Sequence, residues 1–183
     1  MRWPLSEEED EIRKKGLKAL RLLMLDTSVQ PGLKGWELRR RLGKGYADAL
    51  KIATMEADRI GLKIVTVPDE EFPEEIDKAR YVLQTKEPLT DPDYGGWLRI
   101  EEAAALAILI IELSIRGGVI QRDTSEKVLN KKLPIWRIKQ ILEKLKRLGY
   151  LTEEGALIRK GWRAEIEIDE PGFLRDLVNA SST

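Results

Sequence analysis

The segment from residue 100 to residue 168 constrains the fold most, because it predicts a succession of elements that few small domains share. Its first predicted helix, residues 101–116, is apolar on almost all sides, so other elements must cover it. A pair of glycines ends this helix, and Asp123, Thr124 or Ser125 is suited to cap a second, short helix. The segment thus opens with one helix that must be buried and one that is largely polar.

A third predicted helix begins at Pro134, a residue that suits the first helical turn, and ends at Gly149. Its apolar residues recur at the helical period throughout. Beyond it, residues 150–158 have the composition of a β-hairpin, and residues 163–168 alternate at a period of two, as a strand does. Three helices followed by a ribbon of strands predict a winged helix for this half of the chain.

The first half repeats this order of elements. Helices are predicted at residues 7–25, 36–42 and 46–60, and strands at residues 62–67 and 80–84. We expect Trp36 and Ile60 to point into the core, since both fall on the apolar side of their helices. The two halves match in element order rather than in residue identity. The chain is therefore predicted to have an α+β, mostly helical fold, with two tandem winged-helix domains joined by a short elbow.

The domain boundaries follow from composition. A length of 183 residues suits two compact domains better than one winged helix of roughly 70 to 90 residues. The stretch between the halves is rich in proline, glycine and aspartate, as linkers are. We expect a first winged helix at residues 1–86, a linker at 87–98, a second winged helix at 99–170 and a partly mobile tail at 171–183.

The chain contains neither cysteine nor histidine, which excludes disulfides, thiolate or imidazole metal sites and the catalysis that depends on these side chains. No pair of residues has the pattern of a nucleophile and its base, so we expect a protein that is not an enzyme and needs no cofactor. The longest apolar run, residues 103–111, has nine residues, whereas a membrane-spanning helix needs about 20. The amino terminus has no secretion leader, and a cytoplasmic protein without a membrane segment is expected.

Positive charge concentrates in the second half. Between residues 122 and 147 there are nine basic and three acidic residues. A basic third helix could neutralise phosphates of double-stranded DNA without reading its sequence. The candidate DNA-binding residues are Arg122, Lys127, Lys131, Lys132, Arg137, Lys139, Lys144, Lys146 and Arg147. An alternative of equal weight is that these residues form the solvated side of an amphipathic helix.

The corresponding helix of the first half mixes Lys44, Lys51 and Arg59 with acidic residues, which would repel phosphate. We therefore expect only the second half to contact DNA. Tryptophans such as Trp36 and Trp136 are interpreted as core or seam residues, whereas Trp97, beside the linker glycines, is a candidate for a partner interface. The apolar residues Leu106, Ile110 and Leu113 complete that candidate interface.

Several short motifs resemble the MAGE homology domain. They are Tyr81-Val82-Leu83, the apolar helix that runs from Leu106 to Gly117-Gly118, and the segment from Ile141 that ends in Leu148-Gly149-Tyr150-Leu151. In that family, two winged helices are joined by a short elbow, and the second one begins with an apolar helix. The resemblance extends to the wider group of tandem winged-helix, kleisin-interacting (KITE) subunits of SMC complexes, which includes the bacterial segregation and condensation protein B.

The resemblance implies a non-catalytic, nucleoid-associated subunit for chromosome maintenance. Such a subunit pairs with itself or with a sister subunit through its first winged helix, binds the kleisin and helps the SMC ATPase complex to hold DNA. A second class of function remains open on the residues alone. The basic third helix would also suit a winged-helix transcription regulator, and a strong preference for one DNA sequence would favour that alternative.

Overall fold

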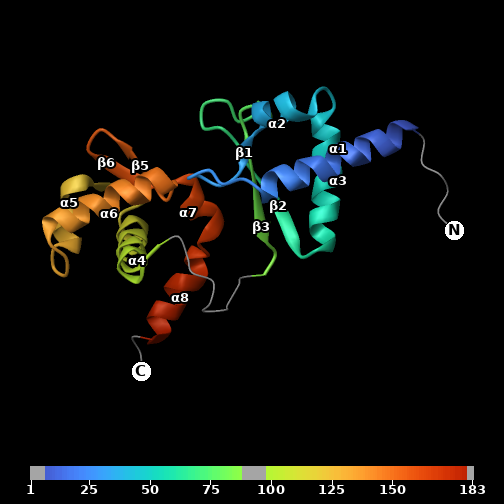
Figure 1. Ribbon diagram of the computed structural model, residues 1–183. Coiled ribbons are helices and arrows are strands. Elements are labelled where there is room, and N and C mark those ends of the chain that lie inside the picture. The colour runs from blue at the N-terminus through green and yellow to red at the C-terminus, as the bar shows by residue number, and fades with distance from the viewer. Residues whose placement is uncertain (1–6, 88–97, 181–183) are drawn as a thin grey trace. The chain divides into compact units, whose positions relative to one another are not determined.

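The computed structural model of the chain describes residues 7–87 and 98–180 (Figure 1). The fold is α+β and mostly helical, with two small antiparallel sheets. The chain divides into two compact units, residues 1–93 and residues 94–183. Within the described residues, none of the helices is both long and apolar enough to cross a membrane.

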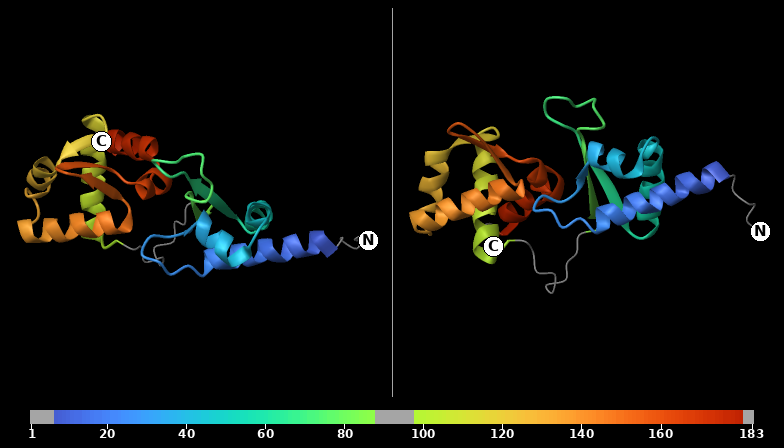
Figure 2. Two further views of the ribbon diagram at one scale, coloured as in Figure 1. Left: turned by 90° about the horizontal axis from the view of Figure 1, so that it is seen from above. Right: turned by 45° about the horizontal axis from the view of Figure 1, so that its top comes forward.

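The first unit consists of three helices and a three-stranded sheet. Its elements are α1 (Glu7–Met24), β1 (Leu33–Lys34), α2 (Gly35–Leu42), α3 (Tyr46–Arg59), β2 (Leu62–Val67) and β3 (Arg80–Thr85). The strands are antiparallel in the order β1-β3-β2, and Leu33 lies opposite Tyr81. A long loop joins β2 to β3 and projects beyond the sheet (Figure 2). Ala19, Leu38 and Ala53 are fully buried in the core between the helices and the sheet.

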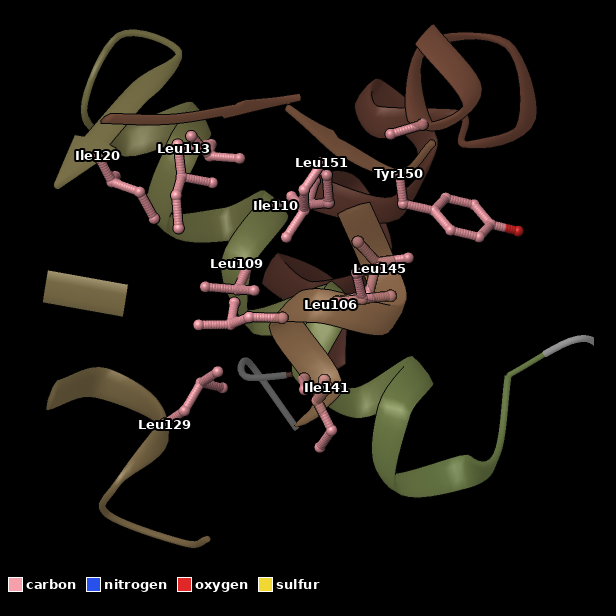
Figure 3. Packing of buried hydrophobic residues seen from close by; sticks show 14 of the residues in the cluster. Leu106, Leu109, Ile110, Leu113, Ile120, Leu129, Ile141, Leu145, Tyr150 and Leu151 are labelled. Carbon is pink, nitrogen blue, oxygen red and sulfur yellow. The ribbon is translucent and has the colours of Figure 1, made fainter. Parts of the chain in front are cut away.

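The second unit has the same order of elements, followed by two more helices. Its elements are α4 (Ile100–Ile115), β4 (Val119–Gln121), α5 (Arg122–Leu129), α6 (Ile135–Leu148), β5 (Leu151–Glu154), β6 (Leu157–Lys160), α7 (Trp162–Glu167) and α8 (Glu170–Ala180). The strand order β4-β6-β5 repeats that of the first sheet. Leu109 and Leu113 of α4 are completely buried and face Leu145 of α6 and Leu151 of β5 in the core (Figure 3).

The helices predicted in both halves are present, but the prediction of a strand at residues 163–168 is wrong. Residues 163–167 belong to helix α7 (Trp162–Glu167), and Ile168 is its C-cap. Arg163 donates a hydrogen bond from Nε to Oε1 of Glu167 at 2.7 Å, one helical turn away, and the backbone N–H of Ile168 bonds to the carbonyl of Ala164. A six-residue segment is too short to separate the period of two of a strand from the period of 3.6 of a helix. These contacts between residues four apart favour the helix.

The third strand of each sheet comes instead from a short segment for which no strand was predicted, β1 in the first unit and β4 in the second. Strand β4 pairs with β6, so that Ile120 lies opposite Ile158. Because β4 runs directly into α5, Gln121 is the N-cap of that helix, and the predicted caps Asp123, Thr124 and Ser125 lie inside it. Strands of two and three residues are too short to show alternation, and pairing partners distant in the sequence decide them.

Two predictions of burial in the first unit are also wrong. The side chain of Trp36 is 48% exposed, and its ring lies 5.3 Å from the guanidinium carbon of Arg40. Ile60 is 58% exposed because it is the C-cap of α3, with a φ of −108°, and no longer follows the helical face. In contrast, Tyr46, Ala49, Leu50, Ala53 and Ala57 of α3 are buried.

Candidate nucleic-acid and partner interfaces

Helix α6 holds most of the basic residues that the sequence singles out. Its apolar side is buried, from Ile138 to Leu148, and Gly149 ends the helix with a φ of +86°, which a residue with a side chain rarely adopts. Burial of this side fixes the rotation of the helix. The polar side chains are thereby directed either toward α4 and β5 or toward solvent.

Two cations of α6 are bound to carboxylates of α4. The guanidinium of Arg137 donates to Oε2 of Glu101 from Nε at 2.9 Å and from Nη2 at 2.8 Å. Lys144 Nζ lies 2.6 Å from Oε2 of Glu102, one of the few buried charged residues in the described part of the chain. These ion pairs join α4 to α6. Arg137 and Lys144 therefore stabilise the domain rather than present free charge to a phosphate.

Glu102 is held on two sides. Besides Lys144, its carboxylate accepts a hydrogen bond from the backbone N–H of Arg99 at the start of α4, at 2.9 Å. Burial alone would raise the pKa of Glu102, but the hydrogen bonds from Lys144 and Arg99 outweigh it and hold this pKa below its ordinary value. Glu102 is therefore ionised at neutral pH.

A second cluster of ion pairs joins α5 and α6 to the β-hairpin. Arg122 donates to Glu126 at 3.2 Å and to Glu153 of β5 at 2.8 Å. Lys146 bonds to the same Glu153 and lies 2.6 Å from Glu143. The hydrogen bond from Lys146, together with that from Arg122, lowers the pKa of Glu153 despite its burial. Arg122 and Lys146 are thus also structural.

Four of the nine candidate DNA-binding residues remain as unpaired cations. Within the described ranges, Lys127, Lys131, Lys132 and Lys139 are exposed and have no ion-pair partner. They lie on α5, in the turn between α5 and α6, and on the first turns of α6. Arg147, near the end of α6, is exposed as well. The structure thus divides the predicted basic face into paired residues inside the domain and free lysines at one edge.

Close to these free lysines in the sequence is an exposed tryptophan that was predicted to be a core or seam residue. Trp136 is 62% exposed, and its neighbour Ile135 is 41% exposed. Both precede the first buried position of α6, Ile138, and lie in the first turn of the helix. Counted at 100° per residue, Trp136 lies on the side of α6 opposite the buried Ile138, Ile141 and Leu145. The helical period therefore already indicates its exposure, and the prediction that it is buried was wrong.

The equivalent helix of the first unit offers no such edge. Lys51 pairs with Asp48 at 2.8 Å and Arg59 pairs with Glu56 at 2.9 Å, both within α3. These pairs agree with the expectation that the first half carries a charge-balanced helix. The basic run on α2 is partly engaged too, since Arg39 pairs with Asp77.

The residues predicted for a partner interface are mostly internal. Leu106, Ile110 and Leu113 are 5%, 1% and 0% exposed, because they fill the core of the second unit (Figure 3). They do not form a free surface as predicted. Trp97, the fourth residue of that candidate set, lies outside the described residues.

A groove between α4 and α8 nevertheless reaches this apolar helix. It has a volume of about 180 Å³ and is lined by apolar side chains alone: Leu98, Ala103, Leu106, Ala107, Ile110, Ile168 and Phe173. The small side chains of Ala103 and Ala107, one turn apart on α4, leave the space that forms the groove. Leu106 and Ile110 are therefore its floor rather than its surface.

Helix α8, which forms one side of the groove, is tied to the domain at its first residue. The carboxylate of Glu170 binds Lys160 of β6 and accepts a hydrogen bond from the hydroxyl of Ser114 on α4. The hydrogen bond from Lys160, followed by that from Ser114, lowers the pKa of Glu170. The sequence predicts a partly mobile tail from residue 171, whereas the structure has a helix from Glu170 to Ala180.

These carboxylates predict how stability depends on pH. The pKa values of Glu102, Glu153 and Glu170 are lowered from an ordinary value of 4.5, so their contribution is complete above about pH 4.5 and is lost as the pH falls through their folded values. Without histidine or cysteine, no side chain of ordinary pKa titrates between about pH 6 and 8. We expect the urea midpoint to be constant from about pH 6 to 8 and to fall below about pH 4.5.

Glu102→Gln provides the control for this measurement. The variant is expected to be less stable than the original chain at neutral pH, because glutamine has no charge to pair with Lys144. It should lose less stability on acidification, because glutamine has no carboxylate to protonate. A urea midpoint that changes steeply between pH 6 and 8 would contradict the attribution of the pH dependence to these three glutamates.

No protein-family model matches the sequence, and no curated protein matches it either. Among solved structures, a chain of the "Nse1-Nse3-Nse4 complex" has a similar fold, with a TM-score of 0.68 over 98% of this chain and 93% of that chain. The aligned part includes both compact units. The two sequences are 15% identical, and the likeness therefore shows a shared fold.

Proposed function

We propose that the protein is a non-catalytic accessory subunit of an SMC–kleisin complex, built from two tandem winged helices. The observation that carries the proposal is the likeness in fold, over nearly the whole chain, to a chain of the Nse1-Nse3-Nse4 complex. The repeated element order and strand order of the two units support the tandem arrangement. In this role the protein binds a kleisin, contacts DNA through exposed lysines and stays bound to the SMC ATPase.

The groove between α4 and α8 is the proposed site for an apolar segment of the kleisin. Its lining is entirely apolar, and Ala107 lies in its wall with a half-buried side chain. An amphipathic helix docks into such a groove by inserting a few apolar side chains. The open apolar surface would then be covered in the complex, as expected for an interface core.

Co-purification with the kleisin encoded by the same genome tests the proposal. We expect the tagged full chain to capture the kleisin, and Ala107→Glu to weaken the affinity at least about tenfold, because it places a charge in the apolar groove. The matched control is Ala104→Glu, which changes an exposed alanine of the same helix that does not line the groove.

Two results would refute parts of this proposal. Failure of the original chain to capture any kleisin would remove the proposed function itself. Equal capture by Ala107→Glu and Ala104→Glu would leave the function in place but move the binding site elsewhere.

In this proposal the first unit forms the interface with a second copy of the chain or with a sister subunit. That unit exposes apolar side chains at the end of α1 and on α3, among them Met24, Leu25 and Met55 at 55%, 78% and 60%. Light scattering on the purified chain is expected to give the mass of a dimer, alone or with the sister subunit. A monomer under both conditions would contradict the pairing.

The alternative of a sequence-specific transcription regulator is less favoured. Base readout needs side chains that are free to reach the groove edges of DNA. Arg137, the first arginine of α6, is instead bound to Glu101.

A further inference from the structure

One edge of the second unit combines free positive charge with an exposed aromatic ring. We call it the lysine–tryptophan edge and define it by the residues Lys127, Lys131, Lys132, Trp136 and Lys139. Trp136 and Lys139 are three positions apart on α6 and therefore lie on the same side of the helix. Lys131 and Lys132 belong to the turn that leads into this helix.

The turn that carries two of these lysines is held in place from beneath. The backbone N–H groups of Lys132 and Leu133 both bond to the carbonyl of Leu129 at 3.0 Å. Leu129, the last residue of α5, and Ile138, in the first turns of α6, are 1% and 0% exposed in the core. The edge is therefore presented on a fixed backbone rather than on a long loop.

The positive charges of this edge are suited to bind a polyanion. Its four lysines have no carboxylate partner among the described residues, in contrast to Arg122, Arg137, Lys144 and Lys146. A ligand with several phosphates would neutralise them, with release of counterions. The exposed indole of Trp136, four positions after Lys132 and three before Lys139, adds a flat apolar surface to this edge.

Free lysines together with an exposed indole suit single-stranded DNA better than duplex DNA. In a duplex the bases are stacked on one another, so the indole would meet only phosphate and sugar. In a single strand an unpaired base can stack on a tryptophan while the neighbouring phosphates contact lysines.

We propose that the lysine–tryptophan edge binds single-stranded DNA, with phosphates on the four lysines and one base stacked on Trp136. This inference rests on the DNA-contacting part of the proposed function and deepens it. It specifies the form of DNA and assigns a base-stacking residue.

Fluorescence anisotropy with the full chain tests the inference, using a labelled single strand of mixed sequence and a blunt duplex of the same sequence. Trp136→Ala is expected to weaken single-strand binding about tenfold and duplex binding by less than about twofold, because only the unpaired base stacks. Trp136→Phe should retain most of the affinity, since it keeps an aromatic face. The matched control is Trp36→Ala, which removes the 48% exposed tryptophan of the first unit.

The lysines are tested by the salt dependence of binding. The double variant Lys131→Gln and Lys132→Gln should lower the slope of log affinity against log salt concentration by about 1.4, since each phosphate contact on a single strand contributes about 0.7. The same double change of Lys44 and Lys63, exposed lysines of the first unit, should leave the slope unchanged.

The possible outcomes separate this inference from its alternatives. Equal effects of Trp136→Ala and Trp36→Ala, or an unchanged salt slope in the double lysine variant, would overturn it. Tighter binding of the same sequence as RNA, with the same dependence on Trp136, would reject the assignment to DNA. If Trp136→Ala abolishes kleisin capture and leaves DNA binding intact, the edge is a protein interface. Kleisin capture by the original chain without single-strand binding would refute only this inference.

Discussion

Leu109→Ala is expected to lower the free energy of unfolding of the second unit by about 3–5 kcal/mol and to leave the first unit folded. Leu109 is completely buried in the middle of α4, among side chains of α4 and α6 (Figure 3). Truncation removes apolar contacts and leaves a cavity that close-packed neighbours cannot fill. Because small domains are only marginally stable, a loss of this size would unfold a large fraction of the second unit.

Hydrogen exchange followed by mass spectrometry measures this effect separately in each unit. Leu109→Ala should accelerate exchange in α4, α6 and β6, whereas Leu38→Ala, at a completely buried position of α2, should accelerate it in α1 and α3. Ile115→Ala is the control for loss of an apolar side chain without a cavity, since Ile115 is 73% exposed. Equal acceleration throughout the chain in both core variants would mean that the two units fold as one.

Gly161→Ala is expected to destabilise the second unit by about 3 kcal/mol, because the backbone of Gly161 lies directly against the backbone of Gly149. A methyl group at Gly161 would lie 2.3 Å from the carbonyl oxygen of Gly149 and 3.0 Å from the backbone nitrogen of Leu151. Both neighbours are backbone atoms, which cannot rotate away as a side chain can. The change would separate the start of α7 from the junction of α6 and β5.

The matched control is Gly155→Ala in the turn of the β5–β6 hairpin. Gly155 has a φ of +61° and open space around it, so the substitution introduces only backbone strain of about 1 kcal/mol. Thermal unfolding of the two variants should therefore differ clearly, with the lower melting temperature for Gly161→Ala. Similar melting temperatures would show that the close approach of the two glycine backbones is not important for stability.

The helices could be predicted because each carries a repeating apolar side over two or more turns. The helices α1, α2, α3, α4 and α6 have this property, and the structure contains all of them close to the predicted bounds. Short segments were predicted only where alternation or hairpin composition marked them, as for β2, β3 and the β5–β6 hairpin, and β1, β4 and α7 were not predicted. β1 and β4 are defined by pairing with β3 and β6, and α7 by contacts such as that of Arg163 with Glu167.

The candidate sites show the same division. The sequence located the basic cluster correctly, but charge counting cannot tell a paired cation from a free one. Arg137 and Lys127 each count as one positive charge in the sequence. In the described structure, however, Arg137 reaches Glu101, 36 positions earlier in the chain, whereas Lys127 faces solvent without an ion pair. Likewise, the apolar face of α4 identified Leu106 and Ile110 but could not show that they lie beneath a groove.

The sequence by itself determined that the chain is α+β and mostly helical, that the same order of elements occurs twice, and that chemistry based on cysteine or histidine is absent. These properties depend on local periodicity and residue identity. Tertiary structure alone decided which carboxylate meets which cation and where α8 leaves a groove on α4. Each of these depends on contacts between residues far apart in the chain, and packing of the core fixes those contacts only when the whole domain has folded.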